Sequence, residues 1–139
     1  MYDWRIHTGR ISVRVKGIIK KEEKYLVLKR WYDDRIPDPF MWEFIDGEVN
    51  FGEKPDAAVV RNIFECLNVE GSIEKISYIW SNVVGATQII GIAYLCSITE
   101  KEEFNLSEAF GGYEWIEKAD FESYIENQYV LKDILSASL

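Results

Sequence analysis

Polar and apolar residues alternate near the start of the chain and predict a pair of strands. From Ile11 to Lys20 the residues alternate and then run apolar, which is typical of a partly buried strand. The polar turn 21–24 separates this segment from Tyr25–Leu28, a second apolar run. Such an arrangement favours antiparallel pairing. A loop is expected at 33–40, because two prolines there remove backbone donors.

A helix is predicted from Pro55 to Leu67. Pro55 suits the first turn, Asp56 suits the positive end of the helix, and neither Gly nor Pro interrupts the segment. Four apolar residues recur at helical spacing and are expected to form the buried stripe, namely Ala57, Val60, Phe64 and Leu67.

The remaining apolar runs predict several more elements. Met41–Phe44 is expected to be a short strand that enters a turn at Asp46-Gly47. The other expected elements are long strands at Ile73–Val84 and Ala86–Ile98 joined near Gly85, a short strand at Tyr113–Ile116, and helical segments at Phe121–Ile125 and Val130–Leu135. This order favours an α/β fold in which helices cover both faces of a mixed sheet. With 139 residues and no linker, the chain is expected to be one domain, 1–139.

Charge and composition narrow the classes of function. The formal net charge is −8 and no basic patch stands out, which disfavours binding to duplex nucleic acid or to anionic membranes. The chain shows neither an apolar run of membrane-spanning length nor a signal-peptide pattern at its start. Cys66 and Cys96 lack metal-ligand spacing, so we expect two reduced thiols and a cytoplasmic location.

The segment from Gly47 to Val69 carries the candidate chemistry. Glu65 lies one helical turn beyond Arg61 and can pair with it. Asn62, Glu65 and Cys66 stand at positions i, i+3 and i+4 and therefore share a helix face. Such a polar face, preceded by a glycine turn and a glutamate-bearing loop, can hold a divalent cation through oxygen ligands. The alternative is an amphipathic helix with a solvated side.

The spacing resembles the signature of the Nudix hydrolases, G-x5-E-x7-R-E-U-x-E-E-x-G-U, where U is a bulky aliphatic residue. Six residues stand in register with it: Gly47, Glu53, Arg61, Ile63, Glu65 and Val69. The flanks are also similar, with a basic pair closing 26–30, a tryptophan-containing strand at 41–44 and a closing strand at 113–116. The resemblance covers roughly residues 10 to 125 and implies a Nudix-type α/β/α sandwich with a mixed β-sheet between helices.

The sequence departs from the signature at catalytic positions. Arg-Glu is replaced by Arg61-Asn62, and Glu-Glu is replaced by Glu65-Cys66. In the family these helix carboxylates ligate Mg²⁺ or Mn²⁺ and help to activate the attacking water. Two of the three are missing here, because an amide is not a base and a neutral thiol is a poor ligand for hard Mg²⁺.

The resemblance assigns roles to eight residues. Glu53, Glu65 and Arg61 are the expected catalytic residues, whereas Arg30 and Trp42 are expected to bind substrate. The expected metal ligands are Glu65, Asp46, Gly47 and Glu108. Each side chain also has a structural alternative. Glu53 could instead stabilise a helix N-terminus, and Arg61 and Glu65 could form only a surface ion pair. Asp46 could serve as a turn former beside glycine. Glu108 and Arg30 could be solvated surface charges, and Trp42 could pack within a loop.

Two functions therefore follow from the resemblance. The first is a metal-dependent pyrophosphohydrolase, with weakened or absent activity, that acts on a nucleoside diphosphate linked to another moiety. The second is a non-catalytic Nudix-fold module that binds a nucleotide or a protein partner. In either case we expect a small nucleotide ligand, weakly held Mg²⁺ or Mn²⁺, no nucleic-acid duplex and no membrane, and a homodimer remains compatible with the sequence.

Overall fold

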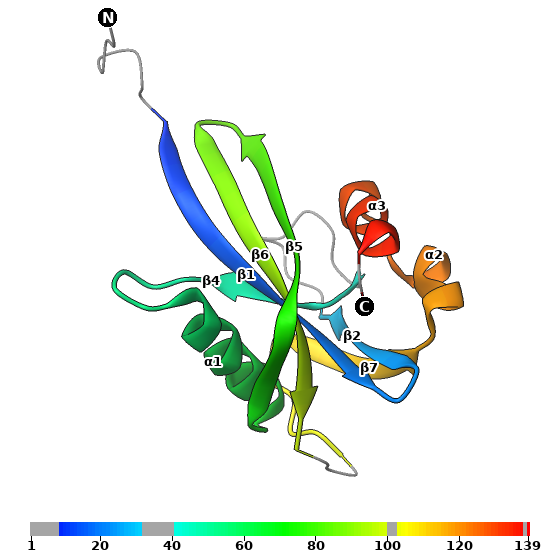
Figure 1. Cartoon of the computed structure of the whole chain (residues 1–139). Helices are drawn as coiled ribbons and strands as arrows, with labels where there is room; N and C mark the ends of the chain where they lie inside the picture. Colours follow the sequence, from blue (N-terminus) through cyan, green and yellow to red (C-terminus); the bar gives the residue numbers. More distant parts are fainter. Residues whose placement is uncertain (1–8, 32–40, 100–102, 138) are drawn as a thin grey trace, which may run out of the picture.

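A computed structural model describes residues 9–31, 41–99, 103–137 and 139 (Figure 1). Its strands and helices, in chain order, are β1 (Arg10–Lys21), β2 (Lys24–Arg30), β3 (Trp42–Glu43), β4 (Ile45–Glu48), α1 (Pro55–Leu67), β5 (Gly71–Val84), β6 (Thr87–Ile98), β7 (Phe110–Ile116), α2 (Phe121–Tyr124) and α3 (Gln128–Ser136), with a short 3-10 turn, η2, at Lys118–Asp120.

Strand β1 organises a mixed sheet. It runs parallel to β6 from Arg10 to Ile19 and antiparallel to β4 from Arg14 to Gly17. Its last residues pair with β2, which in turn pairs with β3 and β7, while β5 pairs with β6. The predicted N-terminal hairpin and the two long strands are therefore confirmed, and Gly85 turns between those strands with a φ of 60°. The mixed sheet between helices is confirmed as well.

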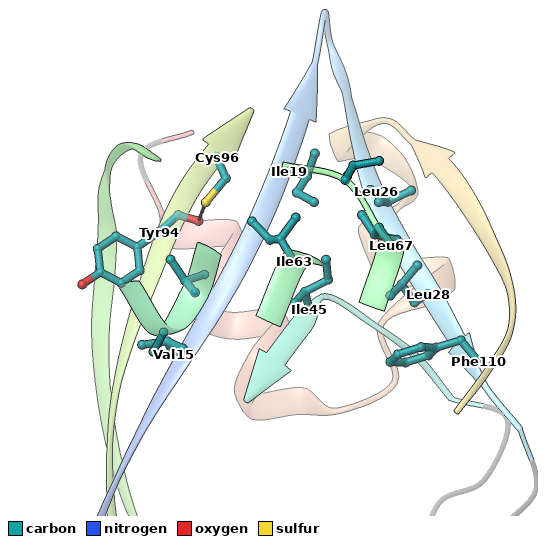
Figure 2. Close-up of a cluster of buried hydrophobic side chains, with 13 residues drawn as sticks. Val15, Ile19, Leu26, Leu28, Ile45, Ile63, Leu67, Tyr94, Cys96 and Phe110 are labelled. Carbon is teal, nitrogen blue, oxygen red and sulfur yellow. Dashed lines mark hydrogen bonds between the residues drawn. The ribbon is translucent and has the colours of Figure 1, made fainter. Parts of the chain in front are cut away.

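Helices cover both faces of the sheet (Figure 1). On one face, Ile63 and Leu67 of α1 pack with side chains of β1, β2 and β4, as Figure 2 shows. On the other face, α2 and α3 cover a second cluster that includes Ile18, Phe121 and Ile134. The two apolar clusters therefore bury both faces of the central part of the sheet, whereas much of β5 stays exposed.

The predicted ends of α1 are confirmed. Pro55 stands in the first turn, where its missing N–H costs no hydrogen bond, and Asp56 adds an acidic group there. The helix closes at Asn68, which adopts a left-handed conformation with a φ of 57°. Its N–H donates to the Phe64 carbonyl at 2.8 Å. Asn68 stands at the position of the signature's late glycine, and asparagine tolerates this conformation.

The predicted buried stripe of α1 is wrong, apart from Leu67. Phe64 is 55% exposed, Ala57 is exposed and Val60 is half-buried. The buried residues are instead Ala58, Val59, Asn62, Ile63 and Leu67. Apolar residues surround much of this helix, so spacing alone did not select its inner face. The sheet selects it, because Val59 and Ile63 pack where Gly17 of β1 has no side chain.

Two other predictions change in detail. Asp46 and Gly47 do not form a turn, because they lie within β4 and pair with Lys16 and Val15 of β1. The expected strand at 41–44 is correspondingly shorter and comprises β3 alone. The expected loop at 33–40 lies outside the described residues. Cys66 and Cys96 are free thiols, as predicted. No helix in the described part of the chain is long and apolar enough to span a membrane.

We predict that Gly71→Ala lowers the free energy of unfolding by about 1–3 kcal/mol, the usual cost of overpacking a core. A β-carbon on Gly71 would lie 2.7 Å from Cδ1 of Ile63, a side chain that is fully buried. Gly112→Ala is the control, because no atom lies within 4 Å of its added β-carbon. Urea denaturation of both variants tests this, and equal stabilities would show that α1 has room to shift away from β5.

Candidate functional site

Arg61 on α1 joins three segments at one point. Its Nε and Nη2 donate to the two oxygens of Glu53 at 2.8 and 2.9 Å. Nη1 lies 3.2 Å from Glu65, one turn further along the helix. Nη2 also donates to the backbone carbonyl of Glu48 at 2.9 Å, at the end of β4. The arrangement brings together the three predicted catalytic residues and attaches the loop before the helix to its surface.

Glu53 is committed to this arrangement. Its carboxylate accepts the bidentate pair from Arg61 and also a bond from the Asn50 backbone N–H at 3.1 Å. These donors stabilise the charged form, so they lower the pKa of Glu53 from 4.5 to about 2, with the Arg61 bonds as the largest cause. A carboxylate with so low a pKa is a poor general base near neutral pH. Its geometry is that of a structural clamp.

Asn62 fills the space beneath Gly47. The two residues approach so closely that a methyl group on Gly47 would overlap the Asn62 amide. Asn62 is 7% exposed, and its Nδ2 has no hydrogen-bond partner among the described residues. The resemblance places a metal-binding glutamate at this position. The structure instead holds a buried amide whose nitrogen can donate but cannot ligate a cation.

Cys66 lies one turn further along the same side of α1 and contacts a distant loop. Its backbone carbonyl accepts a bond from the Ser107 N–H at 2.9 Å, which places the exposed Glu108 close to the end of the helix. Burial, with a smaller effect from Glu65, raises the pKa of the Cys66 thiol to about 11. The thiol is therefore neutral at physiological pH.

Asp46 faces away from α1. Neighbouring residues of a strand point to opposite sides, and Gly47 faces Asn62, so Asp46 faces the side covered by α3. There its Oδ1 accepts bonds from Nε and Nη2 of Arg14 at 3.1 and 3.0 Å. The structure therefore does not bring the Asp46 carboxylate together with Glu65.

Arg30 is held at the open end of β2. Its Nε donates to Glu43 of β3 at 2.8 Å, and its guanidinium carbon lies 5.7 Å from the ring centre of Phe110. Burial raises the pKa of Glu43, while Arg30 opposes that shift. Arg30 is one-third exposed, so part of its guanidinium remains available to a ligand.

Trp42 borders a cavity of about 130 Å³ on the α3 side of the sheet. The walls come from β1, β3, β4 and the start of α3, and they include Lys16, Phe44, Asp46, Ile125, Asn127 and Val130. The Trp42 ring packs edge-on against Tyr124 at 5.3 Å between centres. A wider hollow of about 560 Å³ runs along the 48–55 loop and is bordered by Glu48 and Glu53. The smaller cavity is therefore the one that combines aromatic walls with buried polar groups.

The residues present do not fit a divalent-cation site of the expected kind. No group of three or more His, Cys, Asp or Glu side chains in the described ranges is placed to hold a metal ion. Glu53 is neutralised by Arg61, Asp46 lies on the other face of β4, and Cys66 is protonated. Glu65, which is 57% exposed, is the carboxylate on this helix face with oxygens open to solvent.

Three residues around the cavity were not predicted from the sequence. Lys16 is 6% exposed although it is charged, and Arg14 and Glu43 hold the two ion pairs that flank it. The sequence gives little signal for Lys16, because it continues the polar positions Ser12 and Arg14 of an alternating strand, a pattern typical of a solvent-facing side. Its burial appears only in the structure, and a buried lysine needs a partner or a ligand.

Solved structures with the same fold support this description. A solution structure of the E. coli ORF135 protein is 18% identical, with a TM-score of 0.75, and the match covers 94% of this chain and 93% of that one. The MutT protein from Methanosarcina mazei Go1 is 17% identical, with a TM-score of 0.78 and coverages of 92% and 93%. A C. elegans Ap4A hydrolase in a binary complex is 18% identical, with a TM-score of 0.69 and coverages of 90% and 92%. At these identities the likeness shows the fold alone.

The sequence comparison identifies the family directly. No curated protein sequence matches the chain at a significant level. The model of the NUDIX domain, however, matches residues 9–134, which include every element from β1 to most of α3. The match also includes Gly47 and the three residues joined by the Arg61 contacts, Glu53, Arg61 and Glu65. The chain therefore belongs to the NUDIX domain family of hydrolases.

Proposed function

We propose that this chain binds a nucleoside diphosphate linked to another moiety and hydrolyses it far more slowly than a NUDIX enzyme with an intact signature. The observation that carries the proposal is the buried Asn62 amide against Gly47, where the signature has a glutamate. The retained contacts of Arg61 keep the loop and the helix in place. The ligand can therefore still bind beside α1, whereas fewer carboxylates remain to support hydrolysis than in the signature.

The remaining chemistry falls on Glu65. Family enzymes generally use divalent metals, which neutralise the diphosphate and assist the attacking water. We assign the role of accepting a proton from water to Glu65, because its carboxylate is 57% exposed and its contacts with Arg61 are longer than those of Glu53. To Arg30, which is one-third exposed at the open end of β2, we assign the role of pairing with a phosphate oxygen. Trp42 would contact the rest of the ligand from the cavity wall.

Restoring the carboxylates tests the proposal. Asn62→Glu combined with Cys66→Glu should raise hydrolysis of ADP-ribose or a dinucleoside polyphosphate at saturating Mg²⁺ by at least about a hundredfold, the lower end of a general-base contribution. The Asn62→Gln and Cys66→Gln pair is the matched control, with the same lengths and no charge. Both variants must show a cooperative thermal transition, because Asn62 is buried.

The parent protein has its own expected result. Nucleotide substrates should raise its melting temperature, since a ligand that binds only the folded state stabilises it. Its turnover should stay well below the roughly 1–10³ s⁻¹ that is typical of enzymes. Turnover within that range would contradict the proposal of slow hydrolysis. A higher melting temperature without any turnover would favour the non-catalytic module.

Metal affinity provides a second prediction. We expect Mg²⁺ to bind with a dissociation constant in the millimolar range, which corresponds to about 4 kcal/mol. No cluster of three or more potential ligand side chains lies among the described residues, and Glu65→Ala should weaken the binding further. Titration calorimetry measures both values. Micromolar binding that survives Glu65→Ala would place the ligands elsewhere.

The Glu53 clamp predicts a dependence of stability on pH. Because its pKa is lowered to about 2 in the folded state, Glu53 stabilises the fold fully above its ordinary pKa of 4.5. That contribution is lost as the pH falls from about 5 towards 2. Glu53→Gln should therefore be less stable than the parent at pH 7, and the difference should shrink steadily on acidification. Urea denaturation at a series of pH values measures it, and a constant difference would show that the clamp has no electrostatic role.

A further inference from the structure

A buried lysine stands in the wall of the cavity on the α3 side. Lys16 is 6% exposed, and its Nζ lies 4.7 Å from the centre of the Trp80 ring. Within the described ranges no carboxylate comes within ion-pair distance of this ammonium. Burying an ammonium without an ionic partner is costly unless something else supplies acceptor atoms. The cavity is where such an acceptor can enter.

The sheet aligns Asp46 and Lys16 of the cavity wall in one row with Tyr78, which lies outside that wall. Asp46 of β4 pairs with Lys16, Lys16 pairs with Ala93 of β6, and Ala93 pairs with Tyr78 of β5. Paired residues point to the same side of a sheet, so Asp46, Lys16 and Tyr78 all face α3. The Tyr78 hydroxyl is buried and has no hydrogen-bond partner among the described residues. Lys16 is therefore the member of this row that both lines the cavity and lacks an ionic partner among the described residues.

The charges around Lys16 favour a neutral ligand. The carboxylates of Asp46, Glu43 and Asp133 act on Lys16 and raise its pKa against the larger lowering by burial, while Arg14 acts in the opposite sense. Three negative groups near two positive ones oppose the entry of a phosphate or another anion. A neutral group with a carbonyl oxygen can accept a hydrogen bond from the ammonium without that repulsion.

The free hydrogen-bonding atoms describe the complementary ligand. Asn127 uses its Oδ1 to cap α3, accepting from the N–H groups of Tyr129 and Val130, so its Nδ2 is left as a donor. The bonds from Arg14 go to Oδ1 of Asp46, which leaves Oδ2 as an acceptor for a further donor. With the Lys16 ammonium, the cavity thus offers two donors and one acceptor.

The volume of the cavity limits how many rings of a ligand can enter it. A cavity of roughly 150 Å³ accepts one benzene ring, and this one measures about 130 Å³. Trp42 and Phe44 supply aromatic walls for such a ring. Since the cavity is slightly smaller than one that encloses benzene, it takes at most the polar edge of one six-membered ring, and a bicyclic purine would protrude further from it.

From these observations we infer that the cavity binds a pyrimidine base of the uracil type, with Lys16 as the residue that determines specificity. Its two carbonyl oxygens would accept from Lys16 and Asn127, and the N–H between them would donate to Asp46. The inference rests on the proposed function, because it names the base of the nucleotide that the protein binds.

Binding of nucleoside monophosphates tests the inference without any requirement for hydrolysis. Calorimetry with UMP and AMP should show UMP binding at least tenfold more tightly to the parent protein. Lys16→Met should weaken UMP binding roughly tenfold or more, the effect of losing a hydrogen bond from a charged donor. Lys20→Met is the matched control, because Lys20 lies on the same strand but contacts the Tyr25 ring instead.

A second test changes the ligand and uses only the parent protein, so its result does not depend on whether the Lys16→Met variant folds. UMP methylated at N3 loses the N–H that faces Asp46 and should bind the parent at least tenfold more weakly than UMP. Equal affinities for UMP and AMP, or UMP binding that is unchanged in a folded Lys16→Met variant, would overturn the inference and leave the proposed function intact. Failure of every nucleotide to bind, purine or pyrimidine, would overturn the proposed function and the inference with it.

Discussion

The close approach of α1 to the sheet is the constraint on which the rest of the structure depends. Gly17 on β1, Gly47 on β4 and Gly71 on β5 lack the side chains that would hold the helix away. Ile63 and Val59 fill the resulting space, and Asn62 is pressed against Gly47. Because the helix lies this close to the sheet, Arg61 contacts both the end of β4 and the loop that precedes α1.

The same constraint decides which residues are available for chemistry. Once Arg61 is fixed, it takes up Glu53 completely and Glu65 in part. A residue at position 62 must fit beneath Gly47, and an amide does so without adding charge to a buried space. The signature positions that are retained are those that hold the loop and helix together. The positions that have changed are the carboxylates that the fold itself does not need.

Local patterns predicted the elements well and the faces of those elements less well. The bounds of α1 followed from Pro55 and Asp56 at its start and from a run without Gly or Pro through Leu67, which are short-range signals. Its inner face did not, because apolar residues occur on several sides and only the glycines of distant strands select between them. Asp46 was misplaced for a similar reason. It was expected in a turn, and its pairing with Lys16 in β4 turns its side chain towards α3.

Successive residues of β4 face opposite sides of the sheet, so Asp46 and Gly47, one residue apart in the chain, belong to two separate sites. Gly47 faces α1 and the positions where the signature places its carboxylates, whereas Asp46 faces the cavity that contains Lys16. Contacts on the two faces share a backbone but few side chains, because the sheet lies between them. In the proposed function, substitutions at Asn62 and Cys66 change the face where hydrolysis would occur and leave the walls of the cavity unchanged. The groups that we propose to bind the base are held separately, by Arg14 and by the cap of α3, so slow hydrolysis and nucleotide recognition are compatible in one chain.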